Sequence, residues 1–571
     1  MLIERIPSRL RAAVKPVIAV ALLLAAAWII VQRYVLSRES PDQSEELAVK
    51  KKHVISMYAL DYRPGFQPQA IGPPNKEIER VAGEYMEQHP DVYIDFRVIG
   101  VRGDVTEGEW MKPQLMERIA PDIIGVNTEV VWPDVDKGWW VSFEPYMAKP
   151  NPYVPEGQPG SKQWWDLFAN PALTKAKRAP NGELYSLSFD LVETGIFYNR
   201  DIFRRCGIFK DFGIDEPATW KGPKDWKEFL DIHRRIKDHG YIPLVMRIEW
   251  AQDWAQDYLF DQLFYEIIGE IDKEKGSPDE EEYLRGYLFP KELCWLIKKG
   301  YFSPSSRRYR EVWRLMRRWR QFWSKDISNT DSRRLFILQK SAMMWEGSWM
   351  IRRMTLDPLL TFDWGIFYLP PITKKTSPYA CAAEPAVIGG AGTQFSVSNA
   401  AIRKKQVDQV MDFLYFMTKP DTAERLIKEV GEFIPNIKGA KMSPQLEAFA
   451  EIIKHRYCTV KWMYSFRTEF NDLHKRLIEL YLGDGIGLDE FLRRIDENMN
   501  READELLAMH TKPGAKDFWD YSDPKWGEAW NNPGPSDATR CPSSCRRLAT
   551  SRPGEVASFG RGTPHFEESE R

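Results

Sequence analysis

The sequence of 571 residues is poor in the residues that build metal and redox sites, with six cysteines and eight histidines. No two cysteines form a CxxC pair and the histidines form no HExxH motif, so we expect neither a catalytic zinc nor any other cofactor. Cys541 and Cys545 could bridge to each other, but free thiols are an equally good interpretation in a tail of this composition.

An excess of charge of either sign is also missing. Lys and Arg total 80 and Asp and Glu total 82, so the formal net charge is −2. This balance gives no overall attraction to a polyanion, and nucleic acid is not expected as a partner. Hydrophobic residues at 43% and charged residues at 28% are close to the globular average, which excludes a wholly disordered or multi-span membrane chain. This length predicts two or more domains.

One long hydrophobic run is present, at the N-terminus. Four basic residues precede an apolar run over 17–31, an order typical of a secretory signal or of a signal anchor with a cytoplasmic N-terminus. Residues 25–27 are alanines and could mark a cleavage site. Hydrophobic residues continue to Leu36, toward the about 20 needed to span a bilayer, so we favour an uncleaved helix that tethers the chain to the membrane. No cysteine precedes Cys206, which excludes a lipid-modified cysteine after the run.

Composition divides the chain into four segments. Residues 1–36 form the signal peptide or anchor helix, and the polar, charged residues 37–52 are interpreted as a linker. Residues 53–530 are predicted to fold. Residues 531–571 are rich in Pro, Ser, Gly and Arg and are predicted to be disordered.

Strand-like and helix-like stretches alternate through the folded segment, which indicates the α/β class. Residues 53–60 and 92–100 are predicted as strands, with a helix between them in which apolar residues from Ile78 to Met86 recur at three- and four-residue spacing. A helix over 114–119 and a strand over 121–126 follow.

In open sheets of this class, ligands bind at the carboxyl ends of the strands. The loops after Leu60 and Val126 are therefore candidate ligand sites. The side chains in or beside these loops are Tyr58, Asp61, Tyr62, Asn127 and Trp132.

Residues 181–208, NGELYSLSFDLVETGIFYNRDIFRRCGI, carry a family resemblance. They resemble the "dGk-Y-glP-d-...-lfYNkdlFkkaGi" stretch of extracellular solute-binding proteins of family 1, the maltose-binding-like components of ABC importers. Further stretches resemble that family in its own order, namely YMEQHPDVYIDF (85–96), APDIIGV (120–126), PATWKGPKDWKEFL (217–230), LQKSAMMWEGSWMI (338–351), GGAGTQFSVS (389–398) and VMDFLYFMTKPDTAERLIKEVGEFIP (410–435). The chain departs from the pattern by a short insertion before Asp225 and by Gln339 and Lys340, where a glycine is common.

The resemblance implies a two-lobed periplasmic-binding-protein-like fold, with hinge strands and an interlobe cleft that closes on one small ligand. It further implies a non-catalytic, extracytoplasmic protein that delivers a carbohydrate to ABC transporter permease subunits, and we expect a monomer. An exported carbohydrate-active enzyme is an alternative, and would need two carboxylates about 5 to 10 Å apart across the sugar. A membrane-anchored sugar sensor is another.

The aromatic content agrees with a sugar ligand. There are 22 Trp, 23 Tyr and 29 Phe residues, 13% of the chain. Aromatic rings can cover the flat C–H faces of a sugar ring, while carboxylates and amides pair with its hydroxyl groups. A hydroxyl group that is buried without a partner costs about 1 to 3 kcal/mol, which discriminates one sugar from another.

The resemblance places Trp345, Glu346 and Trp349 in a strand-to-helix turn that borders the cleft. Trp345 and Trp349 are four residues apart and would share a helical face. We expect the Trp345 ring to contact the ligand. If one of the two tryptophans is instead a core residue, we expect it to be Trp349. Asp190 follows a predicted strand, where it either lines the cleft or serves as a turn or hinge aspartate.

Three further features have two interpretations each. Gly389 and Gly390 allow close approach of the backbone to a ligand, or only relieve a bend. Trp250 and Trp254 share helical spacing and could wall the cleft or pack in the core. The Arg- and Trp-rich run over 305–323 is compatible with binding to nucleic acid or to a membrane. Its apolar residues form one helical stripe, so we favour a packed amphipathic helix with a basic outer face.

Overall fold

The computed structural model describes most of the segment that is predicted to fold. The described residues are 51–67, 71–98, 107–127, 131–169, 179, 183–215, 217–271, 290–328, 331–381, 385, 388–447, 449 and 468–510. The predicted anchor helix 1–36, most of the linker 37–52 and the predicted tail 531–571 lie outside this part. Within it, no helix combines the length and the apolar character that a membrane span requires.

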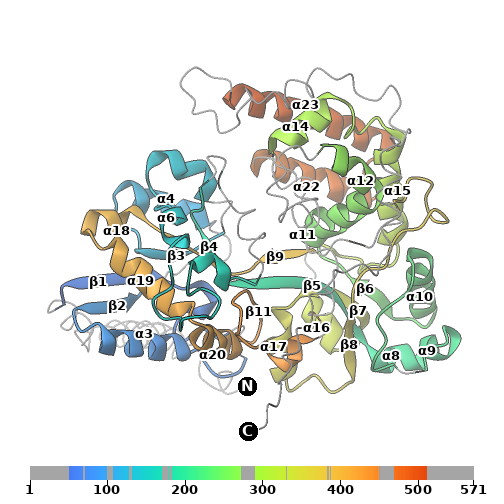
Figure 1. Cartoon of the computed structure of the whole chain (residues 1–571). Helices are drawn as coiled ribbons and strands as arrows, with labels where there is room; N and C mark the ends of the chain where they lie inside the picture. The colour runs from blue at the N-terminus through green and yellow to red at the C-terminus, as the bar shows by residue number, and fades with distance from the viewer. Residues whose placement is uncertain are drawn as a thin grey trace, which may run out of the picture.

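The described chain forms two lobes, each built on a mixed sheet (Figure 1). The sheet of the first lobe has the strand order β2-β1-β3-β10-β4. Its strands are β1 (His53–Tyr58), β2 (Val92–Phe96), β3 (Ile123–Gly125), β4 (Leu187–Ser188) and β10 (Gln394–Val397). Strands β1, β2 and β3 run parallel, and β10 pairs antiparallel with β3 and β4.

Helices from the first part of the chain and from residues 399–430 cover the first sheet. They are η2 (Leu60–Tyr62), α3 (Glu77–Gln88), α4 (Glu107–Met116), η4 (Trp132–Lys137), α6 (Glu144–Met147), η5 (Trp164–Leu167), α18 (Asn399–Lys404), α19 (Val407–Met417) and α20 (Pro420–Val430). Ile78, Val81 and Tyr85 of α3 are buried and pack in the core of this lobe, as their spacing predicts. The β-α-β opening is confirmed, although β1 and β2 end earlier than predicted.

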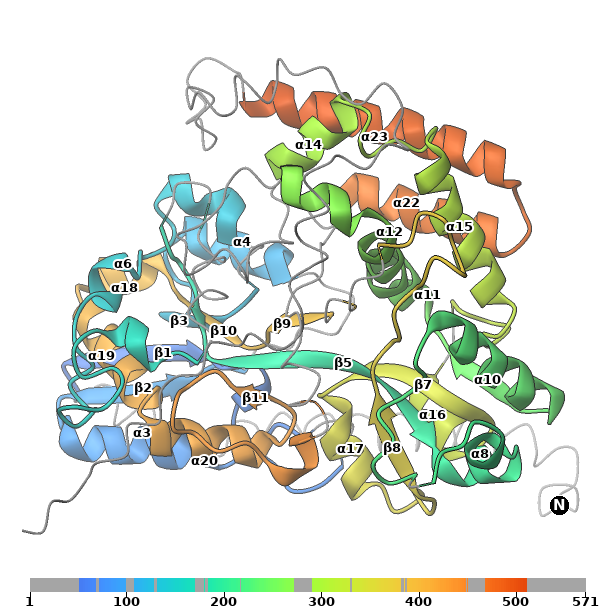
Figure 2. The same cartoon turned by 45° about the vertical axis from the view of Figure 1, so that its right-hand side comes forward.

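The sheet of the second lobe is centred on β5 (Asp190–Asn199) and has the order β11-β5-β7-β6. Its other strands are β6 (Ile242–Val245), β7 (Ser341–Gly347), β8 (Trp364–Phe367), β9 (Gly389–Ala391) and β11 (Ile434–Pro435). The first half of β5 pairs with β9 and β11, and its second half pairs with β7 and β8. Figure 2 shows β5 running from the first lobe into the second.

The second sheet is covered on both faces. Its helices are α8 (Arg200–Arg205), α9 (Ile208–Asp211), α10 (Trp226–Asp238), α11 (Ile248–Trp250), the π-helical turn η6 (Ala251–Ala255), α12 (Gln256–Ile271), α14 (Pro290–Lys298), α15 (Arg307–Arg320), α16 (Ser332–Ile337), α17 (Met350–Leu356), η7 (Pro444–Leu446), α22 (Thr468–Leu482) and α23 (Leu488–His510). All seven residues of β7 are buried. A strand that is buried on both faces is apolar along its length, which explains the run AMMW without alternation.

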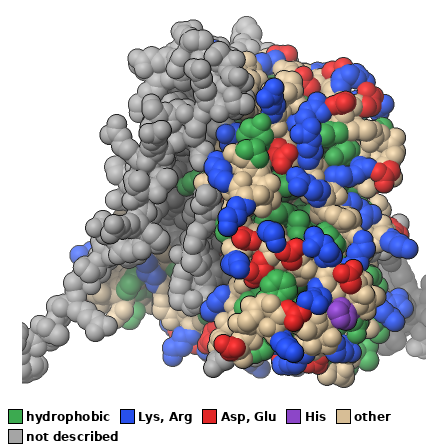
Figure 3. Space-filling view, turned by 90° about the vertical axis from the view of Figure 1, so that its right-hand side faces the viewer, with side chains coloured by type: hydrophobic (Ala, Val, Ile, Leu, Met, Phe, Trp, Pro, Cys, Tyr) green, Lys and Arg blue, Asp and Glu red, His purple; other side chains and the backbone are tan. Residues whose placement is uncertain are grey.

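The Arg- and Trp-rich run forms α15, a packed amphipathic helix as predicted. Val312, Met316 and Trp319 are fully buried in the core of the second lobe. Arginines on its other face pair with acidic groups, such as Arg310 with Asp489 of α23. Positive and negative side chains are interspersed over the outer face of this lobe (Figure 3), so it presents no uniform basic surface.

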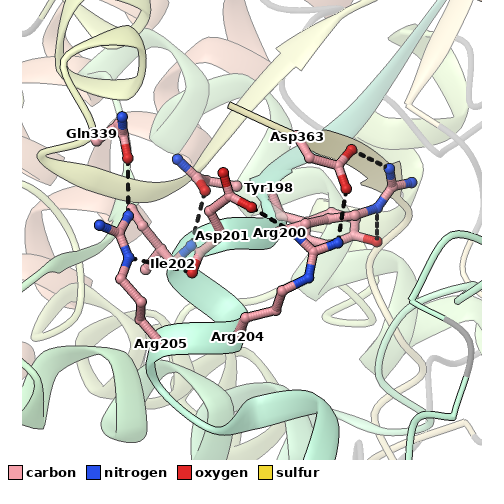
Figure 4. Close-up of polar contacts among 9 residues, drawn as sticks. Tyr198, Arg200, Asp201, Ile202, Arg204, Arg205, Gln339 and Asp363 are labelled. Carbon is pink, nitrogen blue, oxygen red and sulfur yellow. Dashed lines mark hydrogen bonds and ion pairs between the residues drawn. The ribbon is translucent and has the colours of Figure 1, made fainter. Parts of the chain in front are cut away.

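The YNRD segment, which carries much of the family resemblance, joins β5 to α8 and to β8 (Figure 4). The side chain of Asn199 caps α8 by accepting a hydrogen bond from the Ile202 amide at 2.9 Å. Arg200 and Arg204 both donate to the carboxylate of Asp363, at 2.7 and 3.0 Å. The motif therefore has a structural role at the far end of β5.

Within the part that the structure describes, the chain passes between the two sheets at three places that lie side by side. They are the β4-to-β5 link, the β9-to-β10 link and the chain that follows α20 into β11. Hydrogen bonds tie them together, since the Gly392 amide donates to Asp190 O at 2.9 Å and Asn436 Nδ2 donates to Ser188 O at 2.9 Å. We call this group of crossing segments, residues 188–190, 391–394 and 434–436, the connection.

Candidate functional site

Three tryptophans gather in the second lobe beside the end of β7. Trp250 and Trp254 stack with their ring centroids 3.7 Å apart and their planes 6° apart. The ring of Trp349 lies 5.7 Å from Trp254 and 6.4 Å from Trp250. All three side chains are half-buried, so each keeps some surface in contact with solvent. We call these three residues the aromatic cluster.

Local structure explains how these rings meet. Trp250 ends α11, and residues 251–255 form a single π-helical turn, a feature often found at functional sites. Trp349 lies across Gly347, where an added Cβ would sit about 2.2 Å from the indole ring. Glycine at 347 therefore lets the ring lie close to the backbone at the end of β7.

One buried carboxyl group adjoins the aromatic cluster. Glu346 is 3% exposed and accepts a hydrogen bond from the indole N–H of Trp250 at 3.4 Å. Burial raises the pKa of Glu346 to about 7, against the opposing effects of the hydrogen bond from Trp250 and of the nearby Arg247. A carboxyl group of this kind can donate or accept a hydrogen bond near neutral pH.

Trp345 is not exposed, and the prediction that it forms the ligand platform is wrong for this conformation. Its side chain is 0% exposed and packs against Trp319 and Trp254 at centroid distances of 6.0 and 5.7 Å. The period of two along β7 turns Trp345 into the core of the second lobe. Trp349 follows the strand and precedes α17, so it stays partly exposed. The expected exposures of the two tryptophans are therefore reversed.

Asp190 belongs to the connection, which favours the second of its two predicted roles. It is fully buried, accepts a hydrogen bond from the Tyr62 hydroxyl at 2.6 Å and another from the Thr393 amide at 2.7 Å. Burial raises the pKa of Asp190 to about 8, although both hydrogen bonds act to lower it. Its side chain thus links η2, β5 and the chain before β10.

Gly389 and Gly390 also belong to the neighbourhood of the connection. A Cβ at Gly389 would lie about 2.4 Å from both Val192 O and a carboxylate oxygen of Glu193, so glycine is required for β9 to approach β5. Gly390 has φ +150°, in the range that favours glycine. In this conformation both glycines serve the pairing of two strands.

The candidates of the first lobe lie at the ends of β1 and β3. Tyr58 is 7% exposed and packs edge-on against Trp110, with ring centroids 5.7 Å apart. Asn127 is exposed and accepts a hydrogen bond from Gln394 at 3.5 Å. Asp61 is half-buried, and burial raises its pKa. The backbone of Trp132 begins η4, but its side chain lies outside the described part.

The structure thus divides the predicted residues into groups. Trp254, Glu346 and Trp349 come together with Trp250. Asp190 and the two glycines hold the connection. Sequence reasoning missed Arg352 and Glu432, which bear on how the lobes meet. No local signal identifies them, because the partner of Arg352 at Asn75 is 277 residues away.

A separate cavity of about 660 Å³ opens in the second lobe. It is lined by the beginning of β6, the ends of α10 and α15 and the beginning of α16, including Tyr241, Trp323 and Arg334. None of the predicted site residues lines it. Among the described residues, no group of three or more His, Cys, Asp or Glu side chains is placed to hold a metal ion.

Comparison with known proteins identifies relatives over most of the chain. The sequence model of a family described as bacterial extracellular solute-binding protein matches residues 81–452. No curated protein matches the sequence.

Solved structures with a similar fold include RafE in complex with raffinose, with a TM-score of 0.52 and 16% identity, covering 79% of this chain and 99% of that one. A chitin oligosaccharide binding protein has a TM-score of 0.53 and 16% identity, covering 79% of this chain and 100% of that one. The GacH receptor of Streptomyces glaucescens, studied with acarbose, has a TM-score of 0.52 and 14% identity, covering 79% and 99%.

Proposed function

Because the chain belongs to the family of bacterial extracellular solute-binding proteins, we propose that it captures a carbohydrate between its lobes and delivers it to an ABC transporter permease. Members of this family bind solutes and are not catalysts, so the alternative of a carbohydrate-active enzyme is not retained. The sugar is bound reversibly and leaves unaltered. Specificity is then a difference between binding free energies.

The observation that carries this proposal is the aromatic cluster with its adjoining carboxyl group. The partly exposed indoles of Trp254 and Trp349 can cover the C–H face of a sugar ring. Glu346 and the exposed amide of Asn127 are the polar groups that we propose for its hydroxyl groups. Three structurally similar proteins are named or were solved with oligosaccharides or an oligosaccharide mimic, which supports a ligand of this class.

A hinge motion follows from the way the lobes are joined. Among the described residues, short segments join the lobes at the connection, and each lobe has its own core. Two bodies joined by a few strands can rotate about those strands without disturbing either core. We propose that the ligand is held by both lobes and that its binding closes them on the side of the aromatic cluster.

The proposal also includes a place for the protein, outside the cytoplasm and tethered by the hydrophobic helix over 1–36. The family is named for extracellular proteins, and the apolar run at the N-terminus has the flanking charge of an anchor and, with the hydrophobic residues up to Leu36, approaches its length. Membrane fractionation and the mass of the mature chain test this: a chain that is released intact from the membrane by alkaline washing contradicts the tether.

Thermal unfolding in the presence of sugars tests the binding function. The purified protein is heated with raffinose, chitin oligosaccharides, acarbose and a wider sugar panel. A ligand at 100 times its dissociation constant adds about 2.7 kcal/mol to the free energy of unfolding. Trp349→Ala is expected to abolish that gain, whereas Trp139→Ala, a half-buried tryptophan outside the cluster, is the matched control.

Two results would contradict the proposal. A full thermal shift that persists in Trp349→Ala would remove the aromatic cluster from the site. Release of new reducing ends from a bound oligosaccharide would show that the ligand is cut rather than carried.

A further inference from the structure

A second contact between the lobes lies at α17. Arg352, near the beginning of this helix in the second lobe, reaches residues 73–75 of the first lobe. Its guanidinium donates to Pro73 O at 2.6 Å and to Asn75 Oδ1 at 3.2 Å. Arg352 and Asn75 are 6% and 1% exposed, so the bond between them is shielded from water, whereas Pro73 is exposed. A charged hydrogen bond in such surroundings is stronger than one at the surface.

Two neighbouring contacts extend it. Leu356, at the end of α17, packs so closely on Gly72 that an added Cβ there would lie about 2.4 Å from its Cδ1 atom. Gly72 also has φ +78°, which disfavours any other residue. Arg353 Nε lies 4.0 Å from the carboxylate of Glu432, which precedes β11 and is 2% exposed. The contact therefore has a hydrogen-bonded and an apolar part beside the pair of Arg353 and Glu432.

The position of this contact relative to β5 matters. In Figures 1 and 2, α11 and β9 lie above β5, and α17 and β11 lie below it. Trp250 of the aromatic cluster ends α11, whereas Arg352 belongs to α17. Helix α11, which ends at Trp250, is thus on the other side of β5 from the body of α17, and Trp349 lies where α17 begins. A rotation about β5 that brings the lobes together on one side must separate them on the other.

We infer that the contact of α17 with residues 72–75 is a latch that opposes closure of the lobes around the ligand. It rests on the hinge motion of the proposed function. Closing on the aromatic side pulls Arg352 away from Pro73 and Asn75, and the buried amide oxygen of Asn75 loses the hydrogen bond from Arg352. The latch keeps the empty protein open, and ligand binding has to break it.

A distance measurement between spin labels on the two lobes tests the latch without any sugar. The labels replace Lys112 of α4 and Asp472 of α22, two exposed residues on helices above β5, in a chain whose native cysteines are replaced by serine. Arg352→Ala is expected to increase the ratio of short-distance to long-distance molecules about tenfold or more, the change that follows from losing one charged hydrogen bond.

The matched control is Arg333→Ala, which removes an ion pair with Asp357 inside the second lobe. It is expected to leave the distance distribution of the parent protein unchanged. Leu356→Ala removes the apolar part of the contact from a side chain that is 41% exposed, and it is the variant of choice if Arg352→Ala does not unfold cooperatively. It is expected to shift the ratio in the same direction by a smaller factor.

The latch is overturned if Arg352→Ala and Leu356→Ala both give the parent distribution, or a shift toward longer distances. It is also overturned if Arg333→Ala gives the same shift, since the effect would then not come from the interlobe contact. These outcomes are separate from the proposed function, because a protein that shows a sugar-dependent thermal shift can still lack the latch.

Discussion

The aromatic cluster and the connection meet at β5 but are built in opposite ways. The cluster offers three half-buried indoles beside one carboxyl group. In the connection, Asp190 is fully buried and its carboxylate is bonded to Tyr62 and Thr393. Exposed ring faces can contact a ligand, whereas the fully buried carboxyl group of Asp190 cannot be reached by one. The contrast indicates that the connection sets how the lobes are joined and that the cluster is the part that can bind.

The largest expected effect is a loss of stability that differs between Trp345, in β7, and Trp349, in the turn that follows it. Trp345→Ala is expected to lower the free energy of unfolding by about 3 to 5 kcal/mol, because it leaves a cavity in the core. Trp349→Ala is expected to cost less than half as much, since its ring is partly in solvent already. Urea denaturation at 25 °C measures both. Equal losses would mean that Trp349 is a core residue after all.

The next effect concerns the charge of Asp190. Burial holds its pKa at about 8, above the ordinary value of 3.8, so the folded protein keeps a proton that the unfolded chain gives up. Its contribution to stability is complete below about pH 4 and is lost as the pH rises toward 8, by up to about 1.4 kcal/mol per pH unit. Asp190→Asn keeps a neutral side chain that can donate to the Tyr62 oxygen and accept from Thr393.

Asp190→Asn is therefore expected to lose less stability than the parent protein between pH 5.5 and 7.5. Urea denaturation at the two pH values measures the free energy of unfolding of the variant and of the parent protein. Burial also raises the pKa values of Glu346 and Glu432, but both proteins contain these residues, so their contributions cancel when the two pH-dependent changes are subtracted. Asp472→Asn, at an exposed aspartate of α22, is the control and should follow the parent. Parallel pH curves for Asp190→Asn and the parent would show that Asp190 is ionised when folded.

The smallest effects test how tightly the connection is packed. A Cβ at Gly392 would lie about 2.2 Å from Asp190 Oδ1, so Gly392→Ala is expected to lower the free energy of unfolding by about 1 to 3 kcal/mol. Gly83→Ala in α3 has no atom within 4 Å of the new Cβ and is expected to stabilise the protein by about 0.5 to 1 kcal/mol. Two substitutions of the same kind should thus change urea stability with opposite signs. If Gly392→Ala leaves the free energy of unfolding unchanged, the backbone of the connection can shift to accommodate the added Cβ.

The local sequence pattern predicted the helices and strands better than it predicted which distant residues contact one another. The helical spacing from Ile78 to Tyr85 and the apolar runs on both sides of it correctly predicted the β-α-β opening. The helix predicted over 114–119 is Glu107–Met116 in the structure. It begins earlier than predicted and contains Pro113. For Asp190, local pattern left a ligand role and a hinge role equally open. The choice depends on Tyr62 and Thr393, which are 128 and 203 residues away.

The tryptophans of the candidate site also show what local sequence spacing can and cannot predict. Sequence spacing correctly grouped Trp250 with Trp254, since residues four apart share a helical face. It assigned the wrong exposure to Trp345 and Trp349, because it treated them as one helical face although one belongs to a strand and the other follows it.

By itself, the amino-acid sequence determined the α/β class and the segments that form strands and helices, because these depend on periodic patterns between near neighbours. The family was recognisable from the resemblance of its motifs. The tertiary structure alone decided which tryptophan is buried, what Asp190 bonds to and where Arg352 joins the lobes. Burial and hydrogen bonding of these groups depend on residues brought together from distant parts of the chain, and neither leaves a periodic signal along it.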